Sequence, residues 1–397
     1  MKPFDPLLPE VIEDPYPHYQ RLRAELPIHW SERYRTWFVA RYDDVVAAFK
    51  APRLSADRAA ASKYRGPRRP EGLRTLASEP PEHTLVRGVL MKGLSPAIEK
   101  VGSRLDTLVE ALLGRMEESV EGFLDRARLE GEVDLLRDFA YPLPITVIAD
   151  MFEVPAEHRE RFQRLSHDIA RGMDHFYSSR SDGSSFGQLA TFFTGLVEER
   201  RARPGGDLMS RFLEPTESGE RLTVEEAVGL STALLFAGHE TTVNLIGNGV
   251  LALLRNPPEL ERVRDDPRVA VTAVEELLRY DSPAQLIGRA ALEPLELDGV
   301  AIARGDAVAL LLGSANHDAA RFSDPARLDV ARKPNPHLAF GLGHHFCAGA
   351  NLSRLEGRAA IPPLLRRFPR LRLGSTAPRW RQTAVLRGLE SLPVVLS

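Results

Sequence analysis

Phe340-Gly341-Leu342-Gly343-His344-His345-Phe346-Cys347-Ala348-Gly349 contains the only cysteine in a chain of 397 residues. This thiol cannot form an internal disulfide, and its neighbours describe a tight glycine-rich loop that leads into a helix starting near the sulfur. Free amides and the positive end of that helix predict a lowered pKa for the Cys347 thiol. Glycine allows positive φ and lets the backbone lie close to a flat ligand. We therefore expect Cys347 to be the axial ligand of a haem.

Two other interpretations of Cys347 are open from the residue alone. A lone cysteine is most often a small buried hydrophobe, and His345 could activate it as a nucleophile. Alternating residues in a loop rarely point at each other, and the whole pattern Phe-x-x-Gly-x-His-x-Cys-x-Gly is more specific than its parts. At this loop the sequence resembles the cytochrome P450 family of haem-thiolate enzymes. The resemblance implies that Cys347 binds iron, that Phe340, Gly341 and Gly349 belong to the haem loop, and that His345 contacts a haem propionate.

The composition is that of an ordinary globular protein, with 43% hydrophobic residues, 27% charged residues and a formal net charge of -3. That charge gives no reason to expect nucleic acid as a partner. The lack of disulfides fits a reducing compartment, and Met1–Pro6 resembles neither a signal peptide nor a membrane anchor. We expect a cytoplasmic monomer that binds no membrane.

A long helix is predicted over about 224–255. Residues 223–226 read as a capping box, and no proline follows until Pro257. At 1.5 Å per residue this helix is roughly 48 Å long. Glu240 is the only formally charged side chain between 227 and 254, so a membrane span must be considered. The stretch contains too many serine, threonine, histidine and asparagine side chains for a span, and we expect a central core helix.

Glu240 is the conspicuous residue of this helix. A buried carboxylate with no cation beside it in the sequence is costly and needs a partner, water or a proton. Gly238 weakens the helix by about 1 kcal/mol relative to alanine, and the hydroxyls of Thr241 and Thr242 can bond back to carbonyls one turn earlier. These features favour a proton route, and a structural kink with a hydrogen-bonded glutamate is the alternative.

Ala237-Gly238-His239-Glu240-Thr241-Thr242 also resembles the family's oxygen-activation motif. The resemblance implies that Thr241 hydrogen-bonds the bound oxygen and that Glu240 relays protons from solvent. Ala237 and Gly238 would leave room for O2.

Three further basic residues are candidates for haem propionates. His83 and Arg87 lie one helical turn apart, which suits a ligand with two carboxylates and is also common among surface charges. In the family the helix that carries such a pair follows a Pro-Pro-Glu-His-Thr segment, which Pro80 to Thr84 match here, with His83 as its histidine. The resemblance implies that His83, Arg87 and Arg289 reach the propionates.

Glu276 and Arg279 stand three residues apart on a predicted helix. Such pairs are common on exposed helices and are weak evidence alone. Their position about 70 residues before Cys347 resembles the family's structural Glu-x-x-Arg pair. The resemblance assigns them to folding and haem retention.

The resemblance covers nearly the whole chain and implies a mainly α fold with a smaller β region, in one unit over residues 1–397 around the long helix. The β-rich part is expected at about 27–41, 285–312 and 370–397. Helical periodicity predicts helices over 105–124, 139–152, 156–173 and 186–203. Asp298-Gly299 predicts a hairpin, and Asp43 is expected to cap a short helix.

The function implied is that of a haem b monooxygenase, which inserts one atom of O2 into a C–H or C=C bond of an apolar secondary metabolite. The chain has neither a cysteine set for an iron–sulfur cluster nor a reductase domain, so electrons should come from a ferredoxin and its reductase, or from a flavodoxin. Arg354 and Arg358 could dock that partner or form an ordinary solvated helix face. The substrate pocket is expected to involve residues 55–80, 165–190, 233–237, 284–288 and 383–386.

Two other classes remain open. A peroxide-driven or non-oxygenating haem-thiolate enzyme would not need the threonine and acid of the long helix. A haem-binding protein without turnover would need neither these residues nor a substrate entrance.

Overall fold

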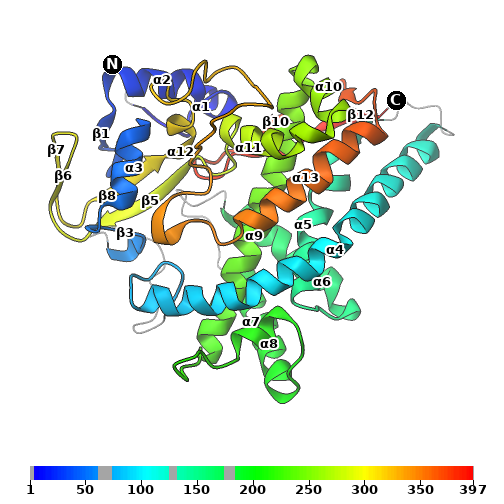
Figure 1. Cartoon of the computed structure of the whole chain (residues 1–397), viewed down its shortest axis with the longest axis horizontal. Helices are drawn as coiled ribbons and strands as arrows, with labels where there is room; N and C mark the ends of the chain where they lie inside the picture. The colour runs from blue at the N-terminus through cyan, green and yellow to red at the C-terminus, as the bar shows by residue number, and fades with distance from the viewer. Residues whose placement is uncertain (1–3, 61–73, 125–131, 174–183, 397) are drawn as a thin grey trace.

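The computed structural model describes residues 4–60, 74–124, 132–173 and 184–396. The expected mainly α fold with a smaller β part is confirmed. In Figure 1 helix α9 runs through the middle, α4 and α13 cross in front of it, and the sheet lies to one side with the N-terminal helices. The helices are α1 (Pro9–Glu13), α2 (Tyr16–Glu25), α3 (Tyr42–Lys50), α4 (Glu82–Leu124), α5 (Pro142–Met151), α6 (Ala156–Met173), α7 (Ser184–Ala202), α8 (Leu208–Phe212), α9 (Val224–Leu254), α10 (Pro257–Asp265), α11 (Ala270–Tyr280), α12 (Leu312–Ala315) and α13 (Ala350–Arg367).

Helix α9 has the predicted bounds and the predicted cap. The Thr223 hydroxyl accepts a hydrogen bond from the Glu226 amide, and the Glu226 carboxylate accepts one from the Thr223 amide. Both bonds satisfy amides that the first helical turn leaves without partners. None of the helices in the described part of the chain combines the length and the hydropathy that a bilayer span requires.

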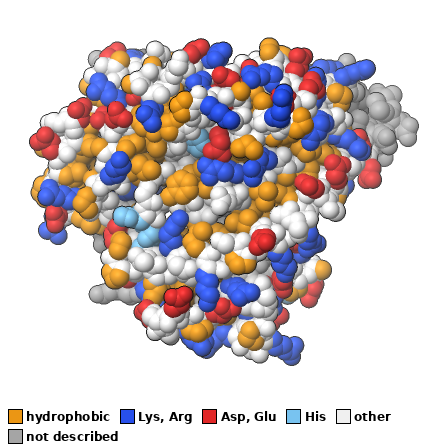
Figure 2. Space-filling model, in the orientation of Figure 1, with side chains coloured by type: hydrophobic (Ala, Val, Ile, Leu, Met, Phe, Trp, Pro, Cys, Tyr) orange, Lys and Arg blue, Asp and Glu red, His pale blue; other side chains and the backbone are white. Residues whose placement is uncertain are grey.

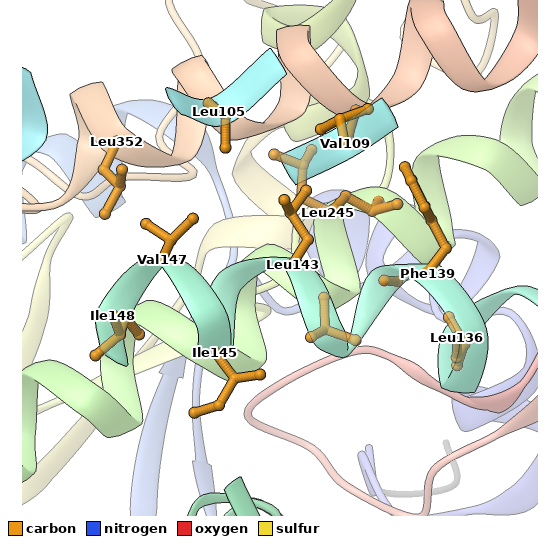
Figure 3. Packing of buried hydrophobic residues seen from close by; sticks show 14 of the residues in the cluster. Leu105, Val109, Leu136, Phe139, Leu143, Ile145, Val147, Ile148, Leu245 and Leu352 are labelled. Carbon is orange, nitrogen blue, oxygen red and sulfur yellow. The ribbon is translucent and has the colours of Figure 1, made fainter. Parts of the chain in front are cut away.

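The hydrophobic core lies between α4, α5, α9 and α13. Figure 3 shows their side chains converging, with Val147 of α5 toward Leu105 of α4, and Leu245 of α9 near Leu143. These four side chains are almost completely buried. Each contributes about 1.5–3 kcal/mol to folding through removal of apolar surface from water. The core therefore holds α9 and the start of α13 in fixed positions.

The main sheet brings distant segments together in the order β1-β2-β8-β5-β3. Strand β2 pairs with β8 in parallel and the other neighbours are antiparallel, so residues 36–39 lie beside 307–310. The strands are β1 (Ile28–Ser31), β2 (Thr36–Val39), β3 (Leu54–Ser55), β5 (Leu286–Ala291) and β8 (Ala307–Leu311). The predicted hairpin is present as β6 (Leu295–Leu297) and β7 (Val300–Ile302), with positive φ at Asp298 and Gly299.

The C-terminal strands form small sheets of their own. β12 (Pro393–Val395) pairs with β4 (Glu132–Asp134) and β9 (Arg372–Leu373), while β10 (Arg379–Trp380) pairs with β11 (Leu389–Ser391). A single bridge between Ala284 and Leu386 links this part to the segment before β5. Strand pairing over such separations depends on how the helices place the segments, which local sequence patterns do not specify.

Two local expectations were wrong. Helix α4 is one continuous helix of 43 residues that contains Pro96, where we expected separate helices. Burial of Leu94 and Leu105 on either side compensates for the hydrogen bond that proline removes. Asp43 lies inside α3 and does not cap it; the N-cap position is Arg41, without a side-chain bond.

Candidate active site

A backbone hydrogen bond within the cysteine loop closes it. The Cys347 amide donates to the Phe340 carbonyl at 2.9 Å, and Gly341 and Gly343 adopt φ of +69° and +78°. Side chains rarely adopt that conformation, so the glycines allow the turn. The loop presents the Cys347 side chain as exposed, directly before α13 begins at Ala350.

The expected fall in the pKa of the thiol is wrong for this structure. Surrounding protein raises the pKa of the Cys347 thiol by desolvation, while the amides of Gly349 and Ala350 and the charges of Arg87 and Arg354 lower it less strongly. The thiol is therefore surrounded by protein and still open on one side. A metal ion bound to sulfur would remove the proton outright.

Four basic groups gather near this loop, and two are histidines. The rings of His83 and His345 lie 4.2 Å apart, centroid to centroid. Among the described residues neither Nε2 atom has a hydrogen-bond partner, although both atoms are buried. Desolvation lowers the pKa of His83, and desolvation together with His83 lowers the pKa of His345 to about 4. No hydrogen bond joins His345 to Cys347 within the described ranges, so a cysteine–histidine nucleophile lacks its required contact.

The other two basic groups near the cysteine loop are Arg87 and Arg289. In the part of the chain that is described, neither guanidinium has a carboxylate within ion-pair distance; Arg289 donates only to the Gly288 carbonyl and lies 5.2 Å from the Phe49 ring. Burial lowers the pKa of Arg289 to about 10. Glu79 also lies beside this cluster, with an oxygen 3.9 Å from His345 Nε2, and it accepts hydrogen bonds from the Ser55 hydroxyl and the Ala56 amide.

These residues fit a haem. Buried basic groups without hydrogen-bond partners, with only one acid beside them, lower the folding stability until anions bind to them. A ligand with two carboxylates and a metal that accepts one thiolate would satisfy the histidines, the arginines and Cys347 together. The observation that carries this fit is the pair of buried Nε2 atoms without partners.

Helix α9 presents three different faces. Ala237 is exposed and Thr241 half-exposed, directly before the buried stretch 242–253 of the same helix, so open space lies beside this turn. The Thr241 hydroxyl donates to the Ala237 carbonyl at 2.7 Å, as the sequence allowed. Thr242 points instead to α13, where its hydroxyl lies 3.4 Å from a carboxylate oxygen of Glu356. A Cβ at Gly238 would lie 3.1 Å from Ile148, so glycine permits close packing of α5 there.

Glu240 has a cationic partner that local sequence did not reveal. Its carboxylate forms a buried ion pair with Arg381, and the same guanidinium donates to the Tyr141 hydroxyl. Glu240 and Arg381 are separated by 141 positions. No pattern within a few residues of Glu240 could have indicated this pair.

The comparisons with known proteins identify the family of the chain. The family model described as Cytochrome P450 matches residues 135–381. The chain belongs to the cytochrome P450 family. "Cytochrome P450 107B1" of Saccharopolyspora erythraea is 38% identical over 96% of this chain and 95% of its own length. "Cytochrome P450 monooxygenase PikC" of Streptomyces venezuelae is also 38% identical, over 96% and 91%. The solved structure of PksS, a cytochrome P450 of the Bacillus subtilis bacillaene polyketide synthase, superposes with a TM-score of 0.88 at 35% identity and covers 100% of both chains.

This cytochrome P450 is a monooxygenase by these relationships, and its family implies an iron-containing haem-thiolate cofactor. Its Glu276–Arg279 pair is completely buried, with two bonds of 2.8 Å between the side chains. Arg279 also donates to the carbonyls of Asn316 and Pro325. The pair therefore holds the segment that leads to the cysteine loop.

Two members of this network were not predicted. Arg332 donates to both oxygens of Glu276 at 3.1 Å, and Asn335 donates to Glu276 Oε2 at 3.2 Å. Glu276 thus receives two guanidinium groups in the P450 interior. A basic residue in the irregular segment before the haem loop was the only available signal.

The proposed docking residues of the P450 differ in their surroundings. Arg354 is engaged by Glu275 through bonds of 2.7 and 2.9 Å and lies 4.6 Å from the Phe340 ring. Its charge is therefore largely neutralised within the protein by Glu275. Arg358 is half-exposed, and His344 in the cysteine loop is exposed.

The expected pocket lies partly outside the part of the chain that the structure describes. Residues 61–73 and 174–183 lie outside the described residues. Leu234, Phe236, Ile287 and Val385 are partly exposed and apolar, as the pocket requires. Gln285 differs, because it is buried and donates to the Ser282 carbonyl at 2.9 Å.

Glu356 on α13 is a second buried carboxyl that the sequence did not single out. Desolvation raises its pKa to about 8, and its only hydrogen bond within the described ranges comes from Thr242. Its other oxygen is buried without a partner. A protonated, neutral carboxyl is therefore the form that this site stabilises at neutral pH.

Glu356→Gln is expected to make the stability of the P450 less dependent on pH. The unfolded carboxyl loses its proton near pH 4.3, while the folded carboxyl keeps it to about 8. The folded state binds more protons in this window, so the wild-type unfolding free energy falls as pH rises through it, by on the order of a few kcal/mol. Glutamine removes this titration. Denaturant unfolding measures this at about pH 5 and about pH 8: the unfolding free energy of the variant, relative to that of wild type, should be higher at the higher pH.

The control is Glu261→Gln, which changes an exposed carboxyl on α10. It should leave the pH dependence of unfolding unchanged. If the unfolding free energies of Glu356→Gln and wild type differ by the same amount at both pH values, a protonated Glu356 in the folded state is contradicted.

Proposed function

We propose that this cytochrome P450 binds haem b and uses O2 to hydroxylate or epoxidise an apolar small molecule, with electrons supplied by separate proteins. The observation that carries the proposal is the exposed Cys347 thiol beside basic groups whose buried donors lack partners. When bound, the haem supplies dioxygen activation, because electron density from the thiolate favours cleavage of the O–O bond.

Cys347 would bind the iron, and the haem loop from Phe340 to Gly349 would cover the same side. His83, Arg87, Arg289 and His345 would bind the two propionates. Charge-assisted bonds to carboxylates are about twice as strong as neutral ones. Their formation would also relieve the repulsion within the basic cluster.

The open turn of α9 supports the oxygen site. Ala237 carries only a methyl group and Gly238 has no side chain, and the Thr241 hydroxyl is bonded to the Ala237 carbonyl on the same helical turn. In this proposal Thr241 holds the oxygen in place by a hydrogen bond, and Glu240 passes protons from solvent toward it. General acid–base catalysis of this kind contributes roughly 100-fold to 10,000-fold.

The substrate is proposed to be apolar and of the size of a polyketide, terpenoid or steroid. Leu234, Phe236, Ile287 and Val385 offer partly exposed apolar surface without a charge among them. PksS, whose structure this chain matches, is named for a polyketide synthase. A shift of the Soret band on titration with candidate compounds would identify the ligand class.

A ferredoxin, or a flavodoxin, is the proposed electron donor. Figure 2 shows basic side chains spaced among hydrophobic ones on the face that carries α4 and α13. Both Arg358 and Arg366 belong to α13; Arg358 is half-exposed and Arg366 is exposed. An acidic redox protein would meet this face by charge complementarity, and Arg354 would support the haem loop instead of the partner.

Thr241→Ala tests the oxygenase proposal. The variant should consume electrons and O2 but release hydrogen peroxide, because the hydroxyl that holds the oxygen is gone. We expect product per electron to fall roughly 10-fold or more. The measurement compares product, peroxide and reductant in turnover with a reduced ferredoxin.

The matched control is Thr232→Ala. The Thr232 hydroxyl donates to the Val228 carbonyl at 2.8 Å on the same helix, so this change removes an equivalent local bond. The amount of product per electron should stay at the wild-type level. If Thr241→Ala also forms as much product per electron as wild type, Thr241 has no part in the mechanism. If the wild-type protein forms product at full rate with peroxide alone, the peroxide-driven class is favoured.

A further inference from the structure

Two stretches of the proposed pocket are joined through their backbones, although they lie far apart in the sequence. A bridge connects Ala284 to Leu386, and a hydrogen bond of 2.8 Å lies on either side of it. These two bonds run from the Gln285 amide to the Val385 carbonyl and from the Arg387 amide to the Pro283 carbonyl. Residues 283–288 and 383–387 are therefore held as one unit, called here the joined wall.

The side chain of Arg387 is a buried cation at the end of the joined wall. Its guanidinium donates to the Asp281 carboxylate at 2.8 Å, and the two side chains are 8% and 12% exposed. The guanidinium carbon lies 3.6 Å from the centre of the Trp380 ring. Asp281 directly follows α11. The ion pair therefore fastens the joined wall to the end of that helix, and loss of one partner would leave an uncompensated buried charge.

The other nitrogen atoms of Arg387 reach the N-terminal segment. They donate to the carbonyls of Ile12 and Glu13, the last two residues of α1. Carbonyls in the last turn of a helix have no partner within the helix, and the helix dipole favours a cation beside them. The Tyr16 hydroxyl of α2 donates to the same Asp281 carboxylate at 2.6 Å. The ion pair therefore also fastens the joined wall to α1 and α2.

The backbone of the joined wall is attached to α9, the helix that carries the proposed oxygen site. The Asn248 side-chain amide donates to the Arg387 carbonyl at 3.0 Å. A Cβ at Gly388 would lie 2.0 Å from the Asn244 side-chain oxygen, so glycine permits this close approach to the helix. The place of the wall relative to the open turn of α9 therefore depends on Arg387 twice, through its carbonyl and through its guanidinium.

The place of the wall affects how an apolar substrate lies beside Thr241. Ile287 and Val385 of the wall offer partly exposed apolar side chains. Apolar contact has no preferred direction, so the shape of the wall, and not a polar bond, orients such a ligand. A displacement of about 1 Å that originates far from the reacting atoms costs roughly 100-fold in rate.

We propose that the Asp281–Arg387 ion pair determines how the substrate is oriented, because it positions the joined wall against the open turn of α9. Both residues act through the wall, so they are positioning residues. The inference rests on the proposed function, in which the two stretches line the pocket of an apolar substrate beside the haem. The ion pair forms and breaks no bond in the reaction, and the carbonyls of α1 belong to the same support.

Ligands that bind the haem iron test this inference without an identified substrate. Imidazole is small and stays at the iron, whereas the phenyl ring of 4-phenylimidazole extends into the pocket. In Arg387→Met the dissociation constant of 4-phenylimidazole should rise about tenfold, because its wall is no longer preorganised, and that of imidazole should change less than about twofold. Titration followed by the Soret band measures both constants. Equal changes for the two ligands would overturn the inference.

Two further variants separate the charge from the rest of the contacts. Arg387→Lys keeps a cation beside Asp281 but has fewer donors for the α1 carbonyls, so it should restore part of the 4-phenylimidazole affinity. The double variant Asp281→Asn/Arg387→Met leaves no uncompensated buried charge, so it carries the test if Arg387→Met does not fold. It should show the same selective loss. A double variant that binds both ligands as wild type does would contradict the proposed role of the pair.

Hydrogen exchange measures the joined wall directly. The amides of Gln285 and residue 387 are bonded across the wall, so they should exchange slowly in the wild-type holoenzyme. In Arg387→Met both should exchange about tenfold faster, because local opening then requires less free energy. Exchange at the wild-type rate in 283–288 and 383–388 would show that the wall does not depend on the ion pair, and the inference would fail.

Arg200→Met is the matched control from outside the proposed pocket. Arg200 of α7 donates to Asp207 at 2.9 Å, and the two side chains are 11% and 0% exposed. This change also leaves a buried carboxylate without its cation and should lower stability. It should alter neither the ratio of the two dissociation constants nor the exchange of the wall. If it changes that ratio as much as Arg387→Met does, general destabilisation explains both results and the inference is overturned.

The two hypotheses fail differently. A wild-type protein that takes up no haem, or whose Soret band does not respond to imidazole, would contradict the proposed function. A wild-type holoenzyme that binds both ligands, together with an Arg387→Met variant that binds both equally well or equally poorly, would contradict the role of the ion pair alone.

Discussion

Cys347→Ser is expected to abolish the long-wavelength Soret band of the reduced protein with carbon monoxide, together with essentially all oxygenase activity. Serine keeps the size of the side chain but its hydroxyl stays protonated, so it cannot donate electron density as a thiolate does. No other cysteine can replace it, since the chain has one. The carbon monoxide difference spectrum of the purified variant, compared with wild type, measures the effect.

His344→Ala is the matched control for Cys347→Ser. His344 lies in the same loop and is exposed, so its loss should leave the band in place. The basic cluster of His83, Arg87, Arg289 and His345 is intact in both variants, and some haem should therefore remain bound to Cys347→Ser. An unaltered spectrum in Cys347→Ser would contradict thiolate ligation and the proposed function with it.

Glu276→Ala is expected to lower the unfolding free energy by about 3–5 kcal/mol, a large part of the stability of a domain. The change strands Arg279 and Arg332, both of which donate to this carboxylate in the interior. It also removes the acceptor for the Asp329 amide and the Asn335 side chain. Denaturant unfolding measures the loss, and haem retained after dialysis reports the effect on the loop.

Glu214→Ala is the control with the same spacing at the surface. Glu214 pairs with Arg211 three residues earlier, with 38% and 42% of the side chains exposed. Its removal should cost less than about 1 kcal/mol, because water screens the pair. Equal losses in the two variants would show that burial does not account for the stability that Glu276 provides.

Much of the fold could be predicted from short stretches of sequence. The bounds of α6 and α9, the capping box and the Asp298-Gly299 hairpin follow from hydrophobic periodicity, cap chemistry and turn residues. These signals act between residues a few positions apart, so they do not depend on the rest of the chain. The glycine-rich cysteine loop belongs to the same group, because its geometry depends on its own glycines.

The environments of the charged groups could not be predicted in this way. Glu240 was expected to need a partner, water or a proton, but its partner Arg381 comes from a segment that packs against α9 only in the folded chain. The predicted fall in the pKa of Cys347 was wrong because local amides act against desolvation by the whole surrounding protein. No pattern in the sequence indicated that Glu356 is buried, since its burial depends on how α13 packs against α9.

Local chemistry therefore determined the bounds of α6 and α9, the Asp298-Gly299 turn and the identity of the thiol that the protein offers. Tertiary structure alone decided which carboxyls are paired, which is neutral, and where buried donors are left for a ligand to satisfy. The reason is physical: backbone preferences and caps are short-range, whereas desolvation and ion pairing depend on every element that excludes water from a site.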